Sequence, residues 1–346
     1  MRVAFVYPNP RHALLPKIAA GNAPDTNLLG ANHLRRSGIE ARVHDSAVLR
    51  TQSAHPFVAR MRWHLRELVV PWELRREDAI VTPLFTLLPL AARPVRGLQV
   101  VVIAYGVVAA WRRAGGLRRR LLRASLQSAS AVVAISEAGR AAIIDEIGLD
   151  PGRVHVAALG IDADWWPALP QAADGHVLAV GRDLARDYAT FARAMASVPA
   201  RGVIVAKPEN LRGVHVPANV EVRLNIAPDE VRELYRGAAC VVVPVAGDDD
   251  PRGTESSGTI SLLEGMACAR ATVITDRATL RDYVDPDATA AVPASDAEAL
   301  AATIKGVVDD PARAERLGRR GRALVEERYT TRALGDRLGQ ILLGPG

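Results

Sequence analysis

Residues 253–267 read Gly253-Thr254-Glu255-Ser256-Ser257-Gly258-Thr259-Ile260-Ser261-Leu262-Leu263-Glu264-Gly265-Met266-Ala267. This segment begins as a polar loop and continues as a helix with one apolar face. Ser256 and Ser257 are suited to cap the helix, because a hydroxyl oxygen can accept an unpaired first-turn N–H. Gly258 lets a ligand approach the backbone closely, and the first N–H groups of a helix favour a phosphate. The pattern predicts an anion site, with Glu264 placed to accept ribose hydroxyls; a well-capped surface helix is the alternative.

Length and composition indicate a globular protein. A chain of 346 residues suits two domains, and with 49% hydrophobic residues it is not disordered. Cys240 and Cys268 lie in apolar surroundings, as buried thiols in a reducing compartment do. The apolar run from Val3 to Tyr7 is too short for a signal peptide, and no run reaches the ~20 apolar residues of a membrane helix. We therefore expect a cytoplasmic protein.

Positive charge is concentrated in the first half of the chain. The formal net charge is +6, and residues 1–165 hold 22 Lys and Arg against 13 Asp and Glu. Two arginine-rich segments, 60–66 and 111–123, also carry apolar side chains. They could make a peripheral contact with the inner face of a membrane or hold a phosphorylated acceptor, while a solvated helix face is the alternative. Nucleic acid is not expected as a partner, because no recognition motif accompanies the charge.

The first half alternates predicted strands and helices. We expect strands at 2–8, 39–44, 79–82, 98–104, 131–135 and 153–157, and helices at 27–37, 54–76, 107–128 and 137–147. This order predicts a doubly wound parallel sheet. We place the N-terminal domain at residues 1–165 and a proline-containing linker at 166–175.

The alternation then restarts. We expect strands at 176–180, 203–206, 220–224, 239–244, 272–275 and 290–292, and helices at 188–196, 228–237, 297–308, 311–328 and 331–342. The fold class is therefore α/β with two Rossmann-like domains, the second at 176–328. The C-terminal segment 329–346 is expected to pack back on the N-terminal domain.

Basic residues follow the predicted strands of the second domain, where a doubly wound sheet binds its ligands. Gly181 and Arg182 follow the strand at 176–180, and Lys207 follows the strand at 203–206. The polar loop at the start of residues 253–267, called the anion loop below, would share one edge of the sheet with them, although each basic residue alone could be a solvated loop charge. The sequence has no P-loop and no G-x-S-x-G motif, and its histidines and cysteines lack the spacing of metal ligands.

These features together resemble the GT-B glycosyltransferases. Residues 257–274 are similar to the signature of the family 4 group, which are retaining enzymes that use nucleotide sugars, and residues 181–188 resemble the turn that holds the diphosphate. Segments 133–136, 159–162 and 234–240 agree as well, so the resemblance spans most of the chain. It implies two Rossmann-like domains that face each other across a cleft.

The resemblance also implies roles for individual residues. Glu264 matches the family's second glutamate, which holds the ribose hydroxyls. Gly258 and Thr259 match the backbone that meets the distal phosphate. Arg182 matches the arginine that neutralises the diphosphate leaving group, where a fixed cation lowers the barrier to bond cleavage.

Three departures from the family pattern bear on catalysis. The family's first glutamate should lie eight residues before Glu264, where Ser256 stands, and Glu255 is one position away. The family's lysine after the arginine is replaced by Arg186 and Asp187, and Lys207 could contribute instead. A histidine found in many relatives is replaced by Tyr105.

The expected sites follow from these matches. The catalytic candidates are Arg182, Glu255 and Ser256; the donor-binding candidates are Gly181, Arg182, Arg186, Lys207, Asn225, Ser257, Gly258, Thr259, Ile260 and Glu264; the acceptor-side candidates are Gly30, His33 and Tyr105. The expected partners are a nucleotide-sugar donor and a small-molecule or lipid-linked acceptor, with no metal and no cofactor. Base, sugar, acceptor and oligomeric state are left open.

The leading hypothesis is a retaining glycosyltransferase. The departures at Ser256 and Tyr105 motivate a second one, a protein of the same fold that binds a nucleotide sugar without turnover. A nucleotide-sugar epimerase of similar architecture is the third.

Overall fold

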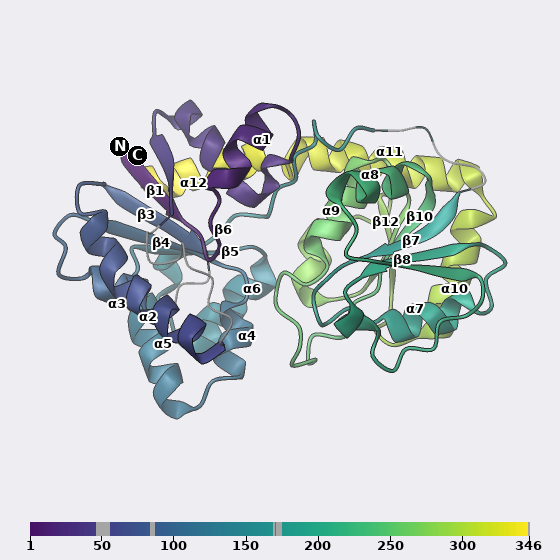
Figure 1. The fold of residues 1–346 in the computed structure, drawn as a ribbon, viewed down its shortest axis with the longest axis horizontal. Helices are drawn as coiled ribbons and strands as arrows, with labels where there is room; N and C mark the ends of the chain where they lie inside the picture. Colours follow the sequence, from purple (N-terminus) through teal and green to yellow (C-terminus); the bar gives the residue numbers. More distant parts are fainter. Residues whose placement is uncertain (46–55, 84–86, 169, 171–174, 345–346) are drawn as a thin grey trace. The chain divides into compact units, whose positions relative to one another are not determined.

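A computed structural model describes residues 1–45, 56–83, 87–168, 170 and 175–344, with the side chains of 56–64 left out (Figure 1). The chain forms two compact units, one made of Met1–Gly160 and Thr331–Gly346 and the other of Ile161–Thr330. Each unit contains a six-stranded parallel sheet. The prediction of an α/β fold with two Rossmann-like units is confirmed.

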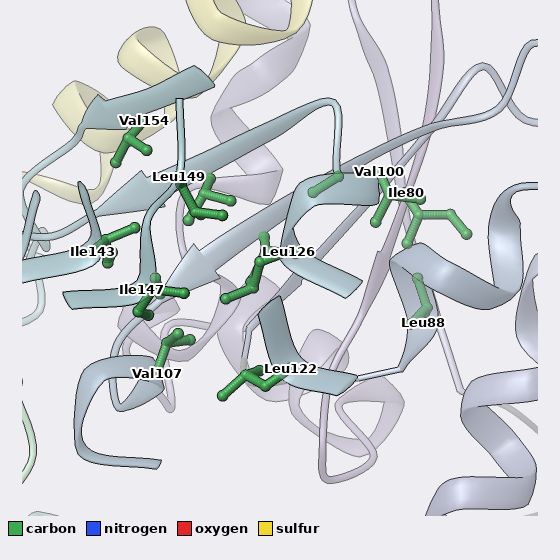
Figure 2. Packing of buried hydrophobic residues seen from close by; sticks show 14 of the residues in the cluster. Ile80, Leu88, Val100, Val107, Leu122, Leu126, Ile143, Ile147, Leu149 and Val154 are labelled. Atoms are coloured by element: carbon green, nitrogen blue, oxygen red, sulfur yellow. The ribbon is translucent and has the colours of Figure 1, made fainter. Parts of the chain in front are cut away.

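The first unit is built on the strand order β2-β1-β3-β4-β5-β6. Its strands are β1 (Arg2–Val6), β2 (Glu40–His44), β3 (Ala79–Pro83), β4 (Gln99–Ala104), β5 (Ala131–Ala134) and β6 (Val154–Val156). Four helices cover one face of this sheet: α2 (Pro56–Glu73), α3 (Leu88–Ala92), α4 (Val107–Arg112) and α5 (Gly116–Ser128). Their apolar side chains meet those of the strands in one buried cluster, which includes Leu88, Leu122 and Leu126 from the helices and Ile80 and Val100 from the strands (Figure 2).

Short elements complete the first unit. They are η1 (His12–Leu14), α1 (Leu15–Ala19), η2 (Asp25–Leu28), η3 (Ala31–Ser37), α6 (Glu137–Ala142), a π-helical turn at Ile143–Ile147 and η6 (Pro151–Arg153). The helix predicted at 27–37 is in fact the two 3-10 helices η2 and η3, because Leu29 and Gly30 between them have positive φ values of 50° and 79°. The helix predicted at 107–128 is divided into α4 and α5, because Gly115 is extended, with ψ at 171°.

The C-terminal helix α12 (Thr331–Leu343) belongs to the first unit, although the chain reaches it only after the second unit. It packs on η3 with Leu334, Leu338 and Leu342 buried. Glycines allow the close approach: a Cβ on Gly30 would lie 2.6 Å from the backbone nitrogen of Gly335. The C-terminal segment thus completes the helical layer over the second face of the sheet.

The second unit has the strand order β12-β11-β10-β7-β8-β9. Its strands are β7 (His176–Val180), β8 (Gly202–Ala206), β9 (Val220–Leu224), β10 (Ala238–Val243), β11 (Thr272–Thr275) and β12 (Thr289–Val292). Helices α7 (Tyr188–Met195) and α10 (Ala297–Val308) pack on one face. On the other face lie α8 (Pro228–Arg236) and α9 (Thr259–Ala267), while α11 (Pro311–Arg328) packs on α9. Two 3-10 helices, η7 (Pro208–Leu211) and η8 (Ala278–Tyr283), lie in its loops.

The boundary between the units falls earlier than the sequence suggested. Trp165 and Trp166 are buried in the second unit, their rings edge-on to each other at 4.7 Å, instead of ending the first domain and opening a linker. Arg322 of α11 donates hydrogen bonds to the carbonyls of Ala163 and Trp166, which fastens this segment to the second unit. Part of the predicted linker lies outside the described residues. No helix in the described part of the chain is both long enough and apolar enough to cross a membrane.

Candidate functional site

The strand order of the second unit brings the predicted donor residues to one edge of its sheet. The chain starts at β7 in the middle, continues outward to β8 and β9, and then returns to β10 on the other side of β7. Such a reversal opens a binding position beyond the carboxyl ends of the strands. Gly181 follows β7, Lys207 follows β8, Asn225 follows β9, and the anion loop follows β10.

The start of α9 differs from the predicted cap. The N-cap residue is Gly258, and the prediction that Ser256 and Ser257 cap the helix is wrong. Gly258 has a φ of 93°, and a Cβ there would lie 2.8 Å from Cγ2 of Val245. Only glycine suits this conformation and this space. The first-turn N–H groups of Ile260 and Ser261 have no acceptor within the helix, so they are suited to an anion.

The loop before α9 is held by hydrogen bonds that the sequence did not indicate. The Oγ of Ser257 accepts from the Thr254 N–H at 3.1 Å, which tightens the loop instead of capping the helix. Arg277, only 4% exposed, donates to the carbonyls of Ser257 and Thr254 and pairs with Asp248 at 3.0 Å. A buried arginine therefore fixes the backbone that leads into the anion site, and Arg277 precedes η8, far from the motif in sequence.

Arg186 contacts a side chain in the first turn of α9. Its side chain is 4% exposed; Nε pairs with Asp183 at 2.8 Å and Nη2 donates to the Oγ of Ser261 in the first turn of α9 at 2.9 Å. Nη1 is buried, and no hydrogen-bond acceptor for it occurs among the described residues. A Cβ on Gly181 would overlap this guanidinium, so the glycine after β7 makes room for it.

Arg186 reaches α9 because two loops pair with each other. The Asp187 N–H donates to the carbonyl of Pro244, and the Ala246 N–H donates to the carbonyl of Ala185. These bonds join the loop after β7 to the loop after β10. Asp187 also caps α7 by accepting from the Thr190 N–H at 3.0 Å.

The other predicted basic residues lie in more open positions. Arg182 is exposed, and its Nη2 donates to the carbonyl of Ile226 at 3.3 Å. Lys207 and Asn225 are exposed as well, and Asn225 has a φ of 52°. Asn210 links the loops after β7 and β8, because its Nδ2 donates to the carbonyl of Asp183 at 2.8 Å.

Glu264 lies one helical turn beyond Ser261 and accepts a hydrogen bond from the hydroxyl of Tyr235 at 2.8 Å. Burial raises the pKa of Glu264 to about 7, although the Tyr235 hydrogen bond and the charge of Arg186 oppose the shift. Tyr235 is fully buried, with its ring edge-on to Trp166 at 5.2 Å. The buried Tyr235 hydroxyl thus holds one carboxylate oxygen of Glu264 in place.

The two candidates for the family's first glutamate differ in exposure. Glu255 is 6% exposed, whereas Ser256 is partly exposed and its hydroxyl lies 3.1 Å from that of Thr254. Thr259 is fully buried, and its Oγ1 has no hydrogen-bond partner within the described ranges. Ile260 is partly exposed at the first turn of α9.

The acceptor-side candidates of the first unit are distributed over two environments. Gly30 contacts α12, and His33 lies 2.8 Å from Asp25 and 3.3 Å from the hydroxyl of Thr331, so both residues help to hold the C-terminal helix. Tyr105 follows β4 at the carboxyl edge of the sheet. Burial raises the pKa of the Tyr105 hydroxyl, and the charge of Arg11 opposes this shift.

Arg11 is the cation beside Tyr105 that the sequence did not indicate. Its guanidinium lies 5.7 Å from the ring centre of Tyr7, and its Nε is buried without an acceptor in the part of the chain that is described. The loop is held by Asp45, which accepts from the N–H groups of Arg11 and His12 at 3.0 to 3.1 Å. No group of three or more His, Cys, Asp or Glu side chains among the described residues could hold a metal ion.

Comparison with known proteins agrees with this arrangement. The family model for Glycosyltransferase Family 4 matches residues 26–165, and the model for Glycosyl transferases group 1 matches residues 209–324. The chain is 32% identical over 235 residues to the alpha-maltose-1-phosphate synthase of Mycobacterium tuberculosis, covering 56% of this chain and 58% of that protein. It spans less than two thirds of the length of the curated relatives it matches.

Two solved structures share the fold over nearly the whole chain. Sucrose-phosphate synthase from Thermosynechococcus elongatus superposes with a TM-score of 0.75 at 17% identity, covering 99% of this chain and 98% of that one. Anabaena HepE in complex with UDP superposes with a TM-score of 0.72 at 13% identity, covering 99% of this chain and 100% of that one. The two family models and the shared architecture identify the chain as a member of the GT-B glycosyltransferases of the family 4 type.

Proposed function

We propose that the protein is a retaining glycosyltransferase that moves a sugar from a nucleoside diphosphate sugar to an acceptor. The observation that carries the proposal is the guanidinium of Arg186, buried with one nitrogen unpaired beside the N-terminus of α9. A buried cation with a vacant donor is costly unless an anion completes it. Family membership supports retention of configuration at the anomeric carbon, and the UDP complex of HepE makes UDP the first donor nucleotide to test.

The diphosphate would lie against the N-terminus of α9, where it would accept from Nη1 of Arg186 and from the first-turn N–H groups. When the bond between the anomeric carbon and the diphosphate oxygen breaks, negative charge grows on that oxygen. Arg186 and the N–H groups of Ile260 and Ser261 are already oriented, so they would stabilise this charge without rearranging. Arg182, exposed at the same edge, would contact the outer phosphate oxygens. Cations and helix N–H groups would then do the work that a metal ion does elsewhere.

Glu264 would hold the ribose of the donor. Its carboxylate accepts hydrogen bonds, and the Tyr235 hydroxyl occupies Oε2, which leaves Oε1 to accept from the sugar. Ser256, the more exposed of the two candidates before Gly258, would contact the transferred sugar, while the buried Glu255 would support the loop.

The acceptor would bind at the carboxyl edge of the first unit's sheet. Tyr105 offers a hydroxyl there, and Arg11 offers a partly buried guanidinium with a vacant donor. An arginine fork suits a phosphate group. Because the names of two similar proteins describe synthases of phosphorylated sugars, sugar phosphates are the first acceptors to test, followed by lipid-linked acceptors.

Calorimetry with UDP, GDP, ADP and dTDP tests the donor site directly. We expect one of these nucleotides to bind to the full chain without added metal and to bind at least about tenfold more weakly to Arg186→Ala. Incubation with the matching nucleotide sugar then separates the functions: slow release of free sugar indicates a transferase, and product from an added acceptor with the anomeric configuration of the donor indicates retention. Conversion of the donor to an epimer would indicate an epimerase, and tight binding without either reaction would indicate a binding protein.

A further inference from the structure

Helix α2 presents apolar side chains to solvent on the face opposite its buried one. Leu65, Leu68, Val69 and Trp72 are exposed by 51%, 49%, 43% and 51%. Their spacing of i, i+3, i+4 and i+7 places them in one stripe along the helix. A helix on the surface of a globular protein normally turns such a stripe toward the core.

The opposite face of α2 makes the arrangement more unusual. Val70 and Leu74 pack into the core there, together with the charged residues Arg66 and Glu67, both fully buried. The helix therefore buries two charged side chains while it exposes four large apolar ones. The fold of the unit does not require this exposed stripe, because the core contacts of α2 are made by its other face.

Helix α5 continues this apolar surface. Leu117 is the most exposed large apolar side chain in the described part of the chain, at 75%, and Leu121 follows one turn later at 44%. Helix α3 packs against both α2 and α5, so the three helices form one layer on the same face of the sheet (Figure 1). We define the α2–α5 surface as the exposed side chains of Leu65, Leu68, Val69, Trp72, Leu117 and Leu121.

The charge around the α5 part of this surface is positive. Between Ala79 and Ser136, which includes α3 and α5, every charged residue of the sequence is an arginine. Arg118 and Arg120 are exposed next to Leu117 and Leu121. The acidic Glu146 that approaches this region is paired with Arg112 at 2.6 Å. Exposed leucines and a tryptophan beside exposed arginines match a membrane surface that carries anionic lipids.

We propose that the α2–α5 surface docks the protein on an anionic membrane. The apolar side chains would enter the boundary between headgroups and acyl chains, and the arginines would contact lipid phosphates. A protein partner would not require arginine as the only charged residue between Ala79 and Ser136, so the charge favours the lipid surface.

The position of α2 connects this surface to the acceptor edge of the first unit. Arg66, on the buried face of α2, donates from Nη1 to the carbonyl of Tyr7 at 3.0 Å. Tyr7 lies at the end of β1, beside Arg11. The membrane would therefore be about one helix diameter, roughly 10 Å, from the residues proposed to bind the acceptor. This geometry favours a lipid-linked acceptor, and that last step rests on the proposed function, whereas the docking itself does not.

Vesicle flotation with the full chain tests the docking. We expect the protein to bind vesicles of phosphatidylcholine that contain about 30% phosphatidylglycerol, and to bind vesicles of phosphatidylcholine alone more weakly. Leu68→Ser combined with Trp72→Ser should lower the partition coefficient about tenfold or more, because two large apolar side chains no longer enter the lipid. Arg118→Glu combined with Arg120→Glu should weaken binding to the anionic vesicles by about fivefold for each arginine. The preference for anionic lipid should then disappear.

Matched controls come from exposed residues elsewhere on the chain. Leu343→Ser changes a leucine that is 58% exposed on α12, and Arg316→Glu reverses an exposed arginine on α11; both should bind vesicles like the wild type. Quenching of tryptophan fluorescence by brominated lipid should fall in Trp72→Phe. All variants should retain wild-type UDP affinity, which separates failure of docking from failure of the donor site. The proposal would be overturned if vesicle binding were the same with and without anionic lipid, or were unchanged by the surface substitutions. A dimer in solution that Leu68→Ser dissociates would also overturn it.

Discussion

At the scale of single residues, the donor site depends on which arginine is buried. The resemblance to the family pointed to Arg182, yet Arg182 is exposed, whereas the buried Arg186 contacts the first turn of α9. We predict that Arg186→Ala weakens UDP binding about 10- to 100-fold, because a charge-assisted hydrogen bond is lost and Asp183 remains unpaired. Arg182→Ala should have a smaller effect. Calorimetry on both variants checks which one loses more UDP affinity. Equal losses of affinity would show that burial of the arginine does not decide how much it contributes to UDP binding.

Arg186→Lys refines this prediction. Arg186 uses two nitrogens for Asp183 and Ser261 and keeps the third for a phosphate. Lysine keeps the positive charge, but its single nitrogen cannot contact all three groups in this planar arrangement. We expect UDP affinity between those of the wild type and Arg186→Ala. Wild-type affinity in Arg186→Lys would mean that charge alone matters at this position.

Glu264 should make stability depend on pH. Its pKa is about 7 in the folded protein, above the ordinary value of 4.5, and burial is the main cause. Between these two values the folded state binds more protons than the unfolded state, so stability falls as pH rises from about 4.5 to about 7. Glu264→Gln should lose this decrease. Urea unfolding of both proteins between pH 4.5 and 8 measures the difference, and parallel pH profiles would contradict the assignment.

At the scale of elements, α9 begins where Gly258 allows it to. We predict that Gly258→Ala destabilises the second unit by about 1–3 kcal/mol, because an alanine there has a φ of 93° and meets Val245. UDP affinity should fall as well, since the first turn of α9 would shift. Gly213→Ala is the matched control: its φ is 73°, but a Cβ there meets nothing within 4 Å. It should cost only the backbone strain and leave UDP binding unchanged.

Local chemistry predicted the elements better than it predicted their ends. Asp187 and Ser136 cap α7 and α6 by accepting first-turn N–H groups, as short polar side chains before a helix commonly do. At α9 the same reasoning failed, because Gly258 turns the backbone and directs the Ser257 hydroxyl back to Thr254. Arg277 and Asn210 could not be predicted, since their partners lie on loops that only the sheet order brings together.

At the scale of the whole molecule, alternating strands and helices are sufficient to predict two parallel sheets. Their boundary is harder to predict, because Trp165 and Trp166 resemble the start of a linker in sequence but pack beside Tyr235. The acceptor-side residues are the least predictable. Gly30 and His33 contact α12, which is some 300 positions later in the chain. Arg11 can be assigned to this site only once the order β2-β1-β3-β4 places the ends of these strands along one edge of the sheet.

The first unit depends on a helix that the chain supplies last, and this should be visible in thermal unfolding. Leu338 of α12 is fully buried, so Leu338→Ala should destabilise the first unit by about 2–5 kcal/mol. The donor residues all lie in Ile161–Thr330, so UDP should raise the melting temperature of the second unit. We therefore expect two separable transitions, one lowered by Leu338→Ala and the other raised by UDP.

Leu343→Ala is the control for this experiment, because Leu343 lies on the same helix but is 58% exposed, and its loss should change stability by less than about 0.5 kcal/mol. Gly258→Ala gives the reciprocal pattern: it should lower the transition that UDP raises and leave the other in place. If Leu338→Ala and Gly258→Ala instead lowered a single common transition, the two units would unfold as one cooperative body. The C-terminal helix would then stabilise the donor site as well as the sheet on which it packs.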